Sequence, residues 1–174
     1  MAVNITHWTE AFSSQLPPFR CPTCHEGSLA EVEESRKIIE SKRSKRAASH
    51  DNWEPDWIEN RFTLLLECSV ATCGELVVVS GDTVQDEEDD EDYHRRWVPH
   101  LRPRSMFPAP YIVELPKELP DTVRRELEQA FALFLVDLNA SANRVRTSLE
   151  RGLDEVGVKK FNKTGQARKS SVSP

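Results

Sequence analysis

The four cysteines of the chain stand in two close pairs, and paired thiolates are the ligands that a structural zinc ion favours. Cys21 and Cys24 are separated by two residues, whereas Cys68 and Cys73 are separated by four. Two short loops with two sulfurs each can surround a tetrahedral ion at about 2.3 Å. Disulfides and unrelated free thiols are the alternatives, but residues 1–19 lack the apolar run of a secretory signal, which disfavours an oxidising compartment. The pattern predicts one structural zinc ion per chain, bound by all four cysteines.

The remaining titratable residues indicate contacts with partners and not catalysis. A closed four-thiolate site leaves no coordination position for a reacting water molecule, and His25 is not needed as a further ligand. The other histidines stand apart from any arrangement that would make a nucleophile, so we expect that the protein is not an enzyme. Arg144 and Arg146 are candidate contacts for a phosphate or for a partner's carboxylate. The plainer interpretation pairs Arg146 with Glu150, four residues further along one helix.

Charged residues are strongly segregated along the chain, whose net charge is −6. Residues 86–92 are all acidic, which predicts a mobile, solvated loop. A sharper interpretation makes this run a decoy that covers a basic surface when no nucleic acid is bound. The segment 36–46 is basic, and Lys42 and Arg43 within it are candidate contacts for phosphate or for a protein partner.

The stretches around the cysteines predict a small β module. Residues 29–33 alternate in polarity, residues 62–66 lead into the second cysteine pair, and residues 76–79 lead out of it. Cysteine loop, strand, cysteine loop, strand is the order found in a zinc ribbon. Residues 80–82 are expected to turn the chain into the acidic loop. Recurrent prolines in residues 99–120 predict an extended connector and not a helix.

Residues 121–158 carry the clearest helical periodicity of the chain. Asp121 can cap a first helix, residues 139–141 mark a break, and Gly157 is placed to end a second helix, which predicts an antiparallel hairpin. The stretch 131–136 of the first helix is apolar on nearly every side. Its surface must therefore be divided between an internal core and an interface with a second copy or another protein. The residues that we expect to be divided in this way are Phe131, Leu133, Phe134 and Val136.

The predicted fold class is α+β: a small four-cysteine zinc ribbon of β-hairpins, a proline-rich connector and an antiparallel helical hairpin. Its five expected parts follow one another along the chain. They are a lead-in segment (1–20), the zinc-ribbon module with its acidic loop (21–98), the connector (99–120), the helical hairpin (121–158) and a basic, disordered tail (159–174). Such a module would depend on its metal for part of its folding free energy.

Several segments together resemble a widespread bacterial family known as a domain of unknown function, number 4145. The resemblance covers most of residues 20–158, and the chain looks like a short or truncated member. The segments that carry it are Cys21–Cys24, Trp53–Ile58, Arg61–Phe62, Cys68, Cys73–Glu75, the proline-rich link 115–120 and, most specifically, Ala140–Glu150. The resemblance implies a zinc ribbon joined to a helical domain related to the HEPN group of nucleotide-binding and RNA-cleaving domains. It also implies a setting among restriction–modification and other phage-defence genes.

One departure from that pattern concerns chemistry. HEPN ribonucleases carry an arginine followed, four to six residues later, by a histidine on the same helix. No histidine follows His100 in this chain, so the ribonuclease activity is not carried over to Arg144 or Arg146.

We therefore expect a cytoplasmic, zinc-stabilised, non-enzymatic interaction or regulatory protein of a bacterial phage-defence or mobile-element setting. Its expected partner is a second copy or another protein, bound through the helical hairpin. The first alternative is a nucleic-acid-binding accessory protein that uses segment 36–46, with Trp53 or Trp57 as a stacking platform, although we expect both tryptophans to cover a small core. The second alternative is a HEPN-type ribonuclease. No apolar run approaches the ~20 residues needed to span a bilayer, so no membrane association is expected.

Overall fold

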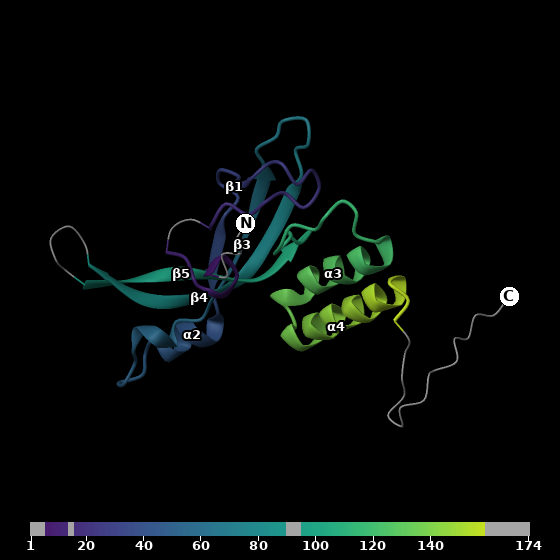
Figure 1. The fold of residues 1–174 in the computed structure, drawn as a ribbon. Coiled ribbons are helices and arrows are strands. Elements are labelled where there is room, and N and C mark those ends of the chain that lie inside the picture. The colour runs from purple at the N-terminus through teal and green to yellow at the C-terminus, as the bar shows by residue number, and fades with distance from the viewer. Residues whose placement is uncertain (1–5, 14–15, 90–94, 159–174) are drawn as a thin grey trace, which may run out of the picture.

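The computed structural model describes residues 6–13, 16–89 and 95–158, and it shows an antiparallel sheet beside a pair of helices (Figure 1). The strands are β1 (Leu29–Glu31), β2 (Lys37–Glu40), β3 (Asn60–Cys68), β4 (Leu76–Asp89) and β5 (Arg95–Phe107). The helices are α1 (Thr6–Thr9), α2 (Lys42–Ala47), α3 (Asp121–Phe134) and α4 (Leu138–Glu155), with one 3-10 turn, η1 (Pro55–Trp57). The predicted α+β class is confirmed. No helix within the described ranges is long and apolar enough to cross a membrane.

The central strand β3 organises the sheet. It pairs with β4 along one edge, while β1 and β2 pair with successive parts of its other edge, and β5 lies beyond β4. Every second residue of β3 is buried, from Asn60 through Cys68, which is the alternation expected for a strand with one covered face. The apolar side chains buried on this face form the main core with Phe19 and the first cysteine. They are Leu29, Phe62, Leu64, Leu66, Val77, Val79, Leu101 and Met106.

The segment before the first cysteine pair joins the sheet to the helices. Trp8 packs against the core residue Phe19, with 4.9 Å between ring centroids, and against Phe134 of α3, with 6.3 Å between ring centroids. Phe12 forms an isolated backbone bridge with Leu101 on the outer edge of β5. The lead-in therefore lies against both parts of the molecule.

The first four residues of the acidic run do not form the loop expected for residues 86–92. Residues 86–89 continue β4, where Glu88 stands opposite Arg96 of β5, and the side chain of His100 contacts Glu88 at 3.0 Å. Opposite charges on neighbouring strands stabilise their pairing, which explains how an acidic stretch can be a strand. Residues 90–92 lie outside the described residues, as does the expected basic tail 159–174.

The connector expected for residues 99–120 is also corrected, because its first part belongs to β5. Pro99 and Pro103 stand in that strand, two residues either side of Leu101, whose N–H points outward to Phe12. The positions where proline lacks an N–H therefore face the outer edge of the sheet, where proline is tolerated. Residues 108–120 alone link the sheet to α3.

No turn occurs at residues 80–82, where β4 continues with a register shift between Ser80 and Gly81. A Cβ atom at Gly81 would lie 2.2 Å from the backbone oxygen of Arg102. Glycine is therefore required here by the close approach of β5 and not by a change of chain direction.

The helical boundaries differ from those predicted. Pro120, not Asp121, is the residue before α3, and α4 begins at Leu138, so that residues 139–141 lie within it. The missed signal is Asp137, whose side chain accepts a hydrogen bond from the backbone N–H of Ala140 at 2.9 Å and caps α4. Gly157 follows α4 with a positive φ of 73°, as its predicted role at the helix end requires.

Candidate metal centre

The first cysteine pair lies in a tight loop before β1. The backbone N–H of Cys21 donates to the carbonyl of Gly27 at 2.8 Å, and that of His25 donates to the carbonyl of Cys21 at 3.2 Å. These bonds curl the loop around its own sulfurs. Backbone N–H groups of Thr23 and Gly27 point at the sulfurs of Cys21 and Cys24, each at 3.4 Å.

The second pair lies where β3 ends and β4 begins. Cys68 is the last residue of β3, and the N–H of Val70 points at its sulfur at 3.5 Å. The N–H of Cys73 donates to the carbonyl of Val70 at 2.9 Å, and Gly74 adopts a positive φ of 57°. The longer spacing of this pair thus holds one extra turn, which returns the chain to the first sulfur.

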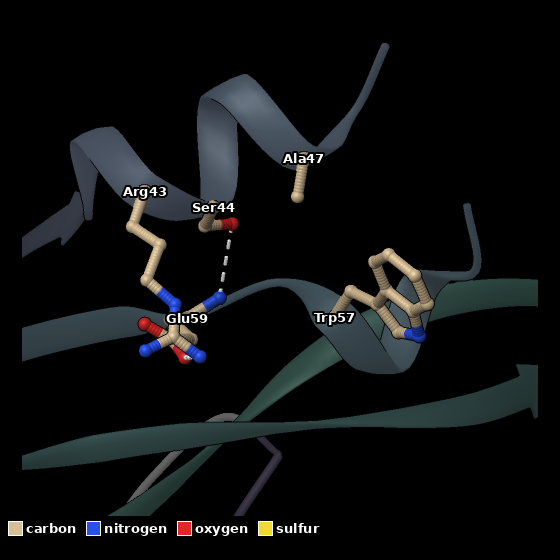
Figure 2. A pocket seen from close by; sticks show the side chains of 5 residues that line it. All are labelled: Arg43, Ser44, Ala47, Trp57 and Glu59. Atoms are coloured by element: carbon tan, nitrogen blue, oxygen red, sulfur yellow. Dashed lines mark hydrogen bonds and ion pairs between the residues drawn. The ribbon is translucent and has the colours of Figure 1, made fainter. Parts of the chain in front are cut away.

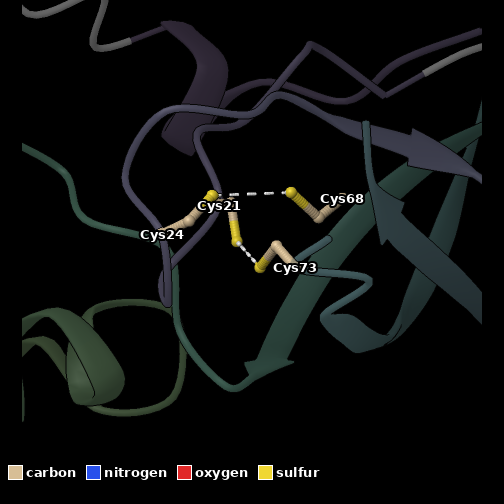
Figure 3. A group of neighbouring side chains, drawn as sticks. All are labelled: Cys21, Cys24, Cys68 and Cys73. Atoms are coloured by element: carbon tan, nitrogen blue, oxygen red, sulfur yellow. Dashed lines mark hydrogen bonds between the residues drawn. The ribbon is translucent and has the colours of Figure 1, made fainter. Parts of the chain in front are cut away.

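The four sulfurs converge on one point between the two loops (Figure 3). The Sγ atoms of Cys21 and Cys73 are 3.8 Å apart, those of Cys24 and Cys68 are 3.6 Å apart, and all four lie within 4.8 Å of one another. A tetrahedral ion with metal–sulfur distances of about 2.3 Å separates its sulfurs by about 3.8 Å. Disulfide sulfurs lie only about 2.05 Å apart. The cysteines are therefore free, and their arrangement can hold a metal ion.

Packing around the sulfurs leaves little freedom to the loops. Cys21 is fully buried, and a Cβ atom added to Gly27 would lie 2.4 Å from the sulfur of Cys68. Glycine is therefore needed for the first loop to approach the second. The side chains of Thr23 and Glu75 form a hydrogen bond that also joins the loops.

Backbone dipoles favour the ionised form of one ligand. The amides of Gly27 and Glu26 lower the pKa of the Cys24 thiol to about 6. The lowered pKa favours the thiolate of this sulfur, which is the form that binds metal ions.

His25 does not join the cluster. Its ring packs against Tyr111, with 4.4 Å between ring centroids, and Tyr111 in turn lies 5.5 Å from Phe131 in α3. Among the described residues, the four cysteines form the one group of metal-ligating side chains close enough to share an ion. His25, next to the first cysteine pair, is thus linked to the helical part through Tyr111.

The predicted contact residues do not converge on one site. Arg144 forms an ion pair with Glu126 of α3 at 3.1 Å, whereas Arg146 forms none with Glu150 within the described part of the chain. Lys42 and Arg43 begin α2, which is a different helix from α4 (Figure 1).

Part of the basic segment lines a pocket together with a tryptophan. A pocket of about 260 Å³ is lined by Arg43, Ser44, Ala47, Trp57 and Glu59, and Trp57 is exposed and not part of the core (Figure 2). Ser44 accepts a hydrogen bond from the N–H of Glu59 at 3.1 Å, and Arg43 pairs with the Glu59 carboxylate at 3.4 Å. The expectation that Trp57 covers a core is wrong.

The four residues expected to divide between core and interface are placed mainly inside the protein. Phe131 is buried, Leu133 and Phe134 are half-buried, and only Val136, in the link after α3, is strongly exposed. Trp8 and Tyr111 cover the aromatic side chains.

Sequence reasoning missed two features of functional interest. The close approach at Gly27 had a weak signal, a glycine three residues after Cys24. The second is that the apolar stripe of α4 faces solvent, whereas Ser141 and Ser148 face α3. Apolar periodicity alone cannot tell which neighbour a stripe contacts.

Comparison with known proteins gives one match. A family model described as a domain of unknown function, DUF8608, matches residues 10–106. No curated protein and no solved structure shows significant similarity to the chain. The resemblance to family 4145 therefore stays a prediction, although the coarser expectation of a domain of unknown function is confirmed. Since the match spans more than half of the sequence and both cysteine pairs, the protein belongs to the DUF8608 family.

Proposed function

We propose that this protein is a zinc-stabilised interaction protein that carries out no reaction of its own. The observation that supports this most strongly is the convergence of four thiols, with sulfur separations of 3.6 and 3.8 Å across the cluster. Soft thiolates in tetrahedral geometry favour zinc among the common cellular metals. One ion per chain would tie the loop before β1 to the β3–β4 turn.

The ion would have a structural role. Four cysteines supply every ligand of a tetrahedral zinc, so no position stays open for water or a substrate. The N–H groups that point at the sulfurs of Cys21, Cys24 and Cys68 stabilise thiolates and orient them. Binding energy at such a site contributes directly to folding.

The cellular setting rests on the sequence resemblance. Segments such as Ala140–Glu150 resemble the bacterial family 4145, with its zinc ribbon and HEPN-like helices, and that family occurs beside phage-defence genes. A reducing bacterial cytoplasm would keep the cysteines available for zinc. A ribbon and helical protein without the motif histidine fits regulation or assembly better than RNA cleavage.

Metal analysis tests this function. Purified protein should contain one zinc per chain, and Cys73→Ser should lose it. Thr72→Ala changes an exposed neighbour in the same loop and should keep it. A native protein without metal, or one whose four thiols titrate freely while the fold persists, would refute the proposal.

A second candidate function is supported by the pocket beside α2. This helix presents Lys42, Lys45 and Arg46 to solvent. Arg43, which is directed toward Glu59, and Trp57 both line the pocket beside it (Figure 2). Exposed aromatic and basic groups together suit a single-stranded nucleic acid, through stacking and phosphate contact. The test is retention of the protein on immobilised single-stranded nucleic acid. A logarithm of affinity that falls linearly with the logarithm of salt concentration, and weaker retention of Trp57→Ala, would favour this candidate.

A further inference from the structure

The outer face of α4 carries a continuous apolar stripe. Its large apolar side chains are all exposed. The exposed fraction is 64% for Leu149 and 75% for Val156, which directly follows the helix. The full stripe consists of Leu138, Ala142, Val145, Leu149, Leu153 and Val156. Single exposed apolar residues are ordinary, but a row of them along one helix face marks a contact surface.

This stripe is not the side of α4 that packs on α3. The contact with α3 uses small residues: Ser141 and Ser148 are 5% and 3% exposed, and the hydroxyl of Ser141 donates to the carbonyl of Ala130 at 2.8 Å. At 100° per residue, both serines lie about 80–100° around the helix from Leu149. The stripe therefore has no covering element within the described chain.

Apart from Leu138, the members of the stripe are spaced symmetrically about Leu149. Ala142 and Val156 stand seven residues before and after it, and Val145 and Leu153 stand four before and after. All four lie within about 40° of Leu149 around the helix. A twofold axis through Leu149 would consequently place Val145 against Leu153, and Ala142 against Val156, of an antiparallel copy.

The charges beside the stripe fit the same arrangement. Arg146 and Glu150 lie about 60° and 100° from Leu149, on the side away from the serines. A twofold axis brings the same flank of both helices together, so Arg146 of one copy would meet Glu150 of the other. Neither side chain forms an ion pair within the described residues, and both are exposed.

We propose that α4 binds a second copy of the chain in an antiparallel pair, with the twofold axis at Leu149. A twofold homodimer requires a self-complementary contact, and the apolar positions on both sides of Leu149, flanked by the opposite charges of Arg146 and Glu150, provide one. This inference rests on the proposed interaction function and names its partner. It also moves the expected interface from α3 to α4.

Sedimentation equilibrium of the full zinc-loaded protein tests the pairing. Wild type should dimerise. Leu149→Glu should raise the dissociation constant of the dimer by at least about a hundredfold, because one leucine of each copy leaves the interface. Ile39→Glu is the control: Ile39 is 67% exposed, but it lies on β2. A wild type that stays monomeric at several hundred micromolar would overturn the inference.

Cysteine crosslinking tests the direction of the helices. Leu149→Cys should form a disulfide dimer under mild oxidation, and Val145→Cys should crosslink with Leu153→Cys but not with itself. In the antiparallel pair two residues at position 145 are about 12 Å apart along the helix, beyond disulfide reach. Self-crosslinking of Val145→Cys would show a parallel pair and contradict the proposal.

Charge reversal gives an independent test of register. Arg146→Glu and Glu150→Arg should each weaken the dimer, and the double variant should recover most of the loss. Absence of recovery would overturn the twofold position at Leu149. Zinc content, measured on the same samples, separates the two ideas: a zinc-bound monomer refutes the pairing alone, while metal-free protein refutes the proposed function.

Discussion

The cysteine-bearing end of the sheet and the pair of helices differ in how they bury their apolar side chains. At the sheet, Phe62, Leu64 and Val77 are buried almost completely, and the sulfurs of Cys21 and Cys68 close the core at one end. In α4 the buried residues are two serines, and the large apolar side chains face outward. The sheet completes its own core, whereas the helical pair leaves a surface that a partner can complete.

The family match follows the same division. The DUF8608 match covers residues 10–106, which include both cysteine pairs and nearly all of β5, and ends before α3. The region with the self-sufficient core is thus the one that the family model describes. Stability and association should accordingly respond to different substitutions.

Loss of a metal ligand is expected to have the largest effect. Cys68→Ser should abolish metal binding and destabilise the sheet by about 4–5 kcal/mol or more, because the ion and a buried thiolate are lost together. Urea unfolding with metal analysis measures this. The helical signal in circular dichroism should fall less than the sheet signal, and a variant as stable as wild type would remove the distinction between the two regions.

Gly27→Ala should act at the same place through shape alone. Its Cβ would lie 2.4 Å from the Cys68 sulfur, so we expect weaker metal affinity and a loss of about 1–3 kcal/mol. The matched control is Gly74→Ala, which meets nothing within 4 Å but has a φ of 57°. That control should cost about 1 kcal/mol in backbone strain and keep the metal. Equal metal affinity in both variants would contradict the close approach.

Neighbouring residues of α4 should show which face is buried. Ser148→Leu would overpack the contact with α3, and we expect a loss of about 1–3 kcal/mol. Leu149→Ser, one position further, should change the stability of the monomer by less than about 0.5 kcal/mol. Thermal or urea unfolding at low protein concentration measures both, and the reverse order of effects would show that the stripe belongs to the internal core.

The smallest expected effect concerns pH. Although burial opposes it, ion pairing with Arg102 at 2.7 Å and with Arg104 lowers the pKa of Asp82. A lowered pKa in the folded state means that the stabilisation is complete above the ordinary value near 3.9 and is lost as the pH falls below it. Asp82→Asn should therefore flatten the acid branch of the stability profile, by no more than about 1 kcal/mol, because the pair is only partly buried and its arginines are exposed to solvent screening. An unchanged acid branch would show that the pair contributes nothing.

The sequence indicated some of this architecture through local signals. Cysteine spacing identified the four residues that converge, and the strand-like run 62–66 before Cys68 identified part of β3, because both signals depend on residues close in the chain or on one strand. The extent of β4 and β5 was missed, since acidic residues 86–89 and Pro99 disfavour strands locally and are accommodated only by pairing with each other's strand. The face of α4 that meets α3 was missed for a related reason. Ser141 and Ser148 carry no hydrophobic signal, yet their small size permits close helix packing.

X-ray absorption at the zinc edge of the purified protein tests the central claim most directly. We expect one zinc per chain with four sulfur neighbours at about 2.3 Å and no nitrogen or oxygen ligand. A first shell that contains nitrogen or oxygen, or a protein that binds no zinc, would contradict the claim that Cys21, Cys24, Cys68 and Cys73 hold a structural zinc ion.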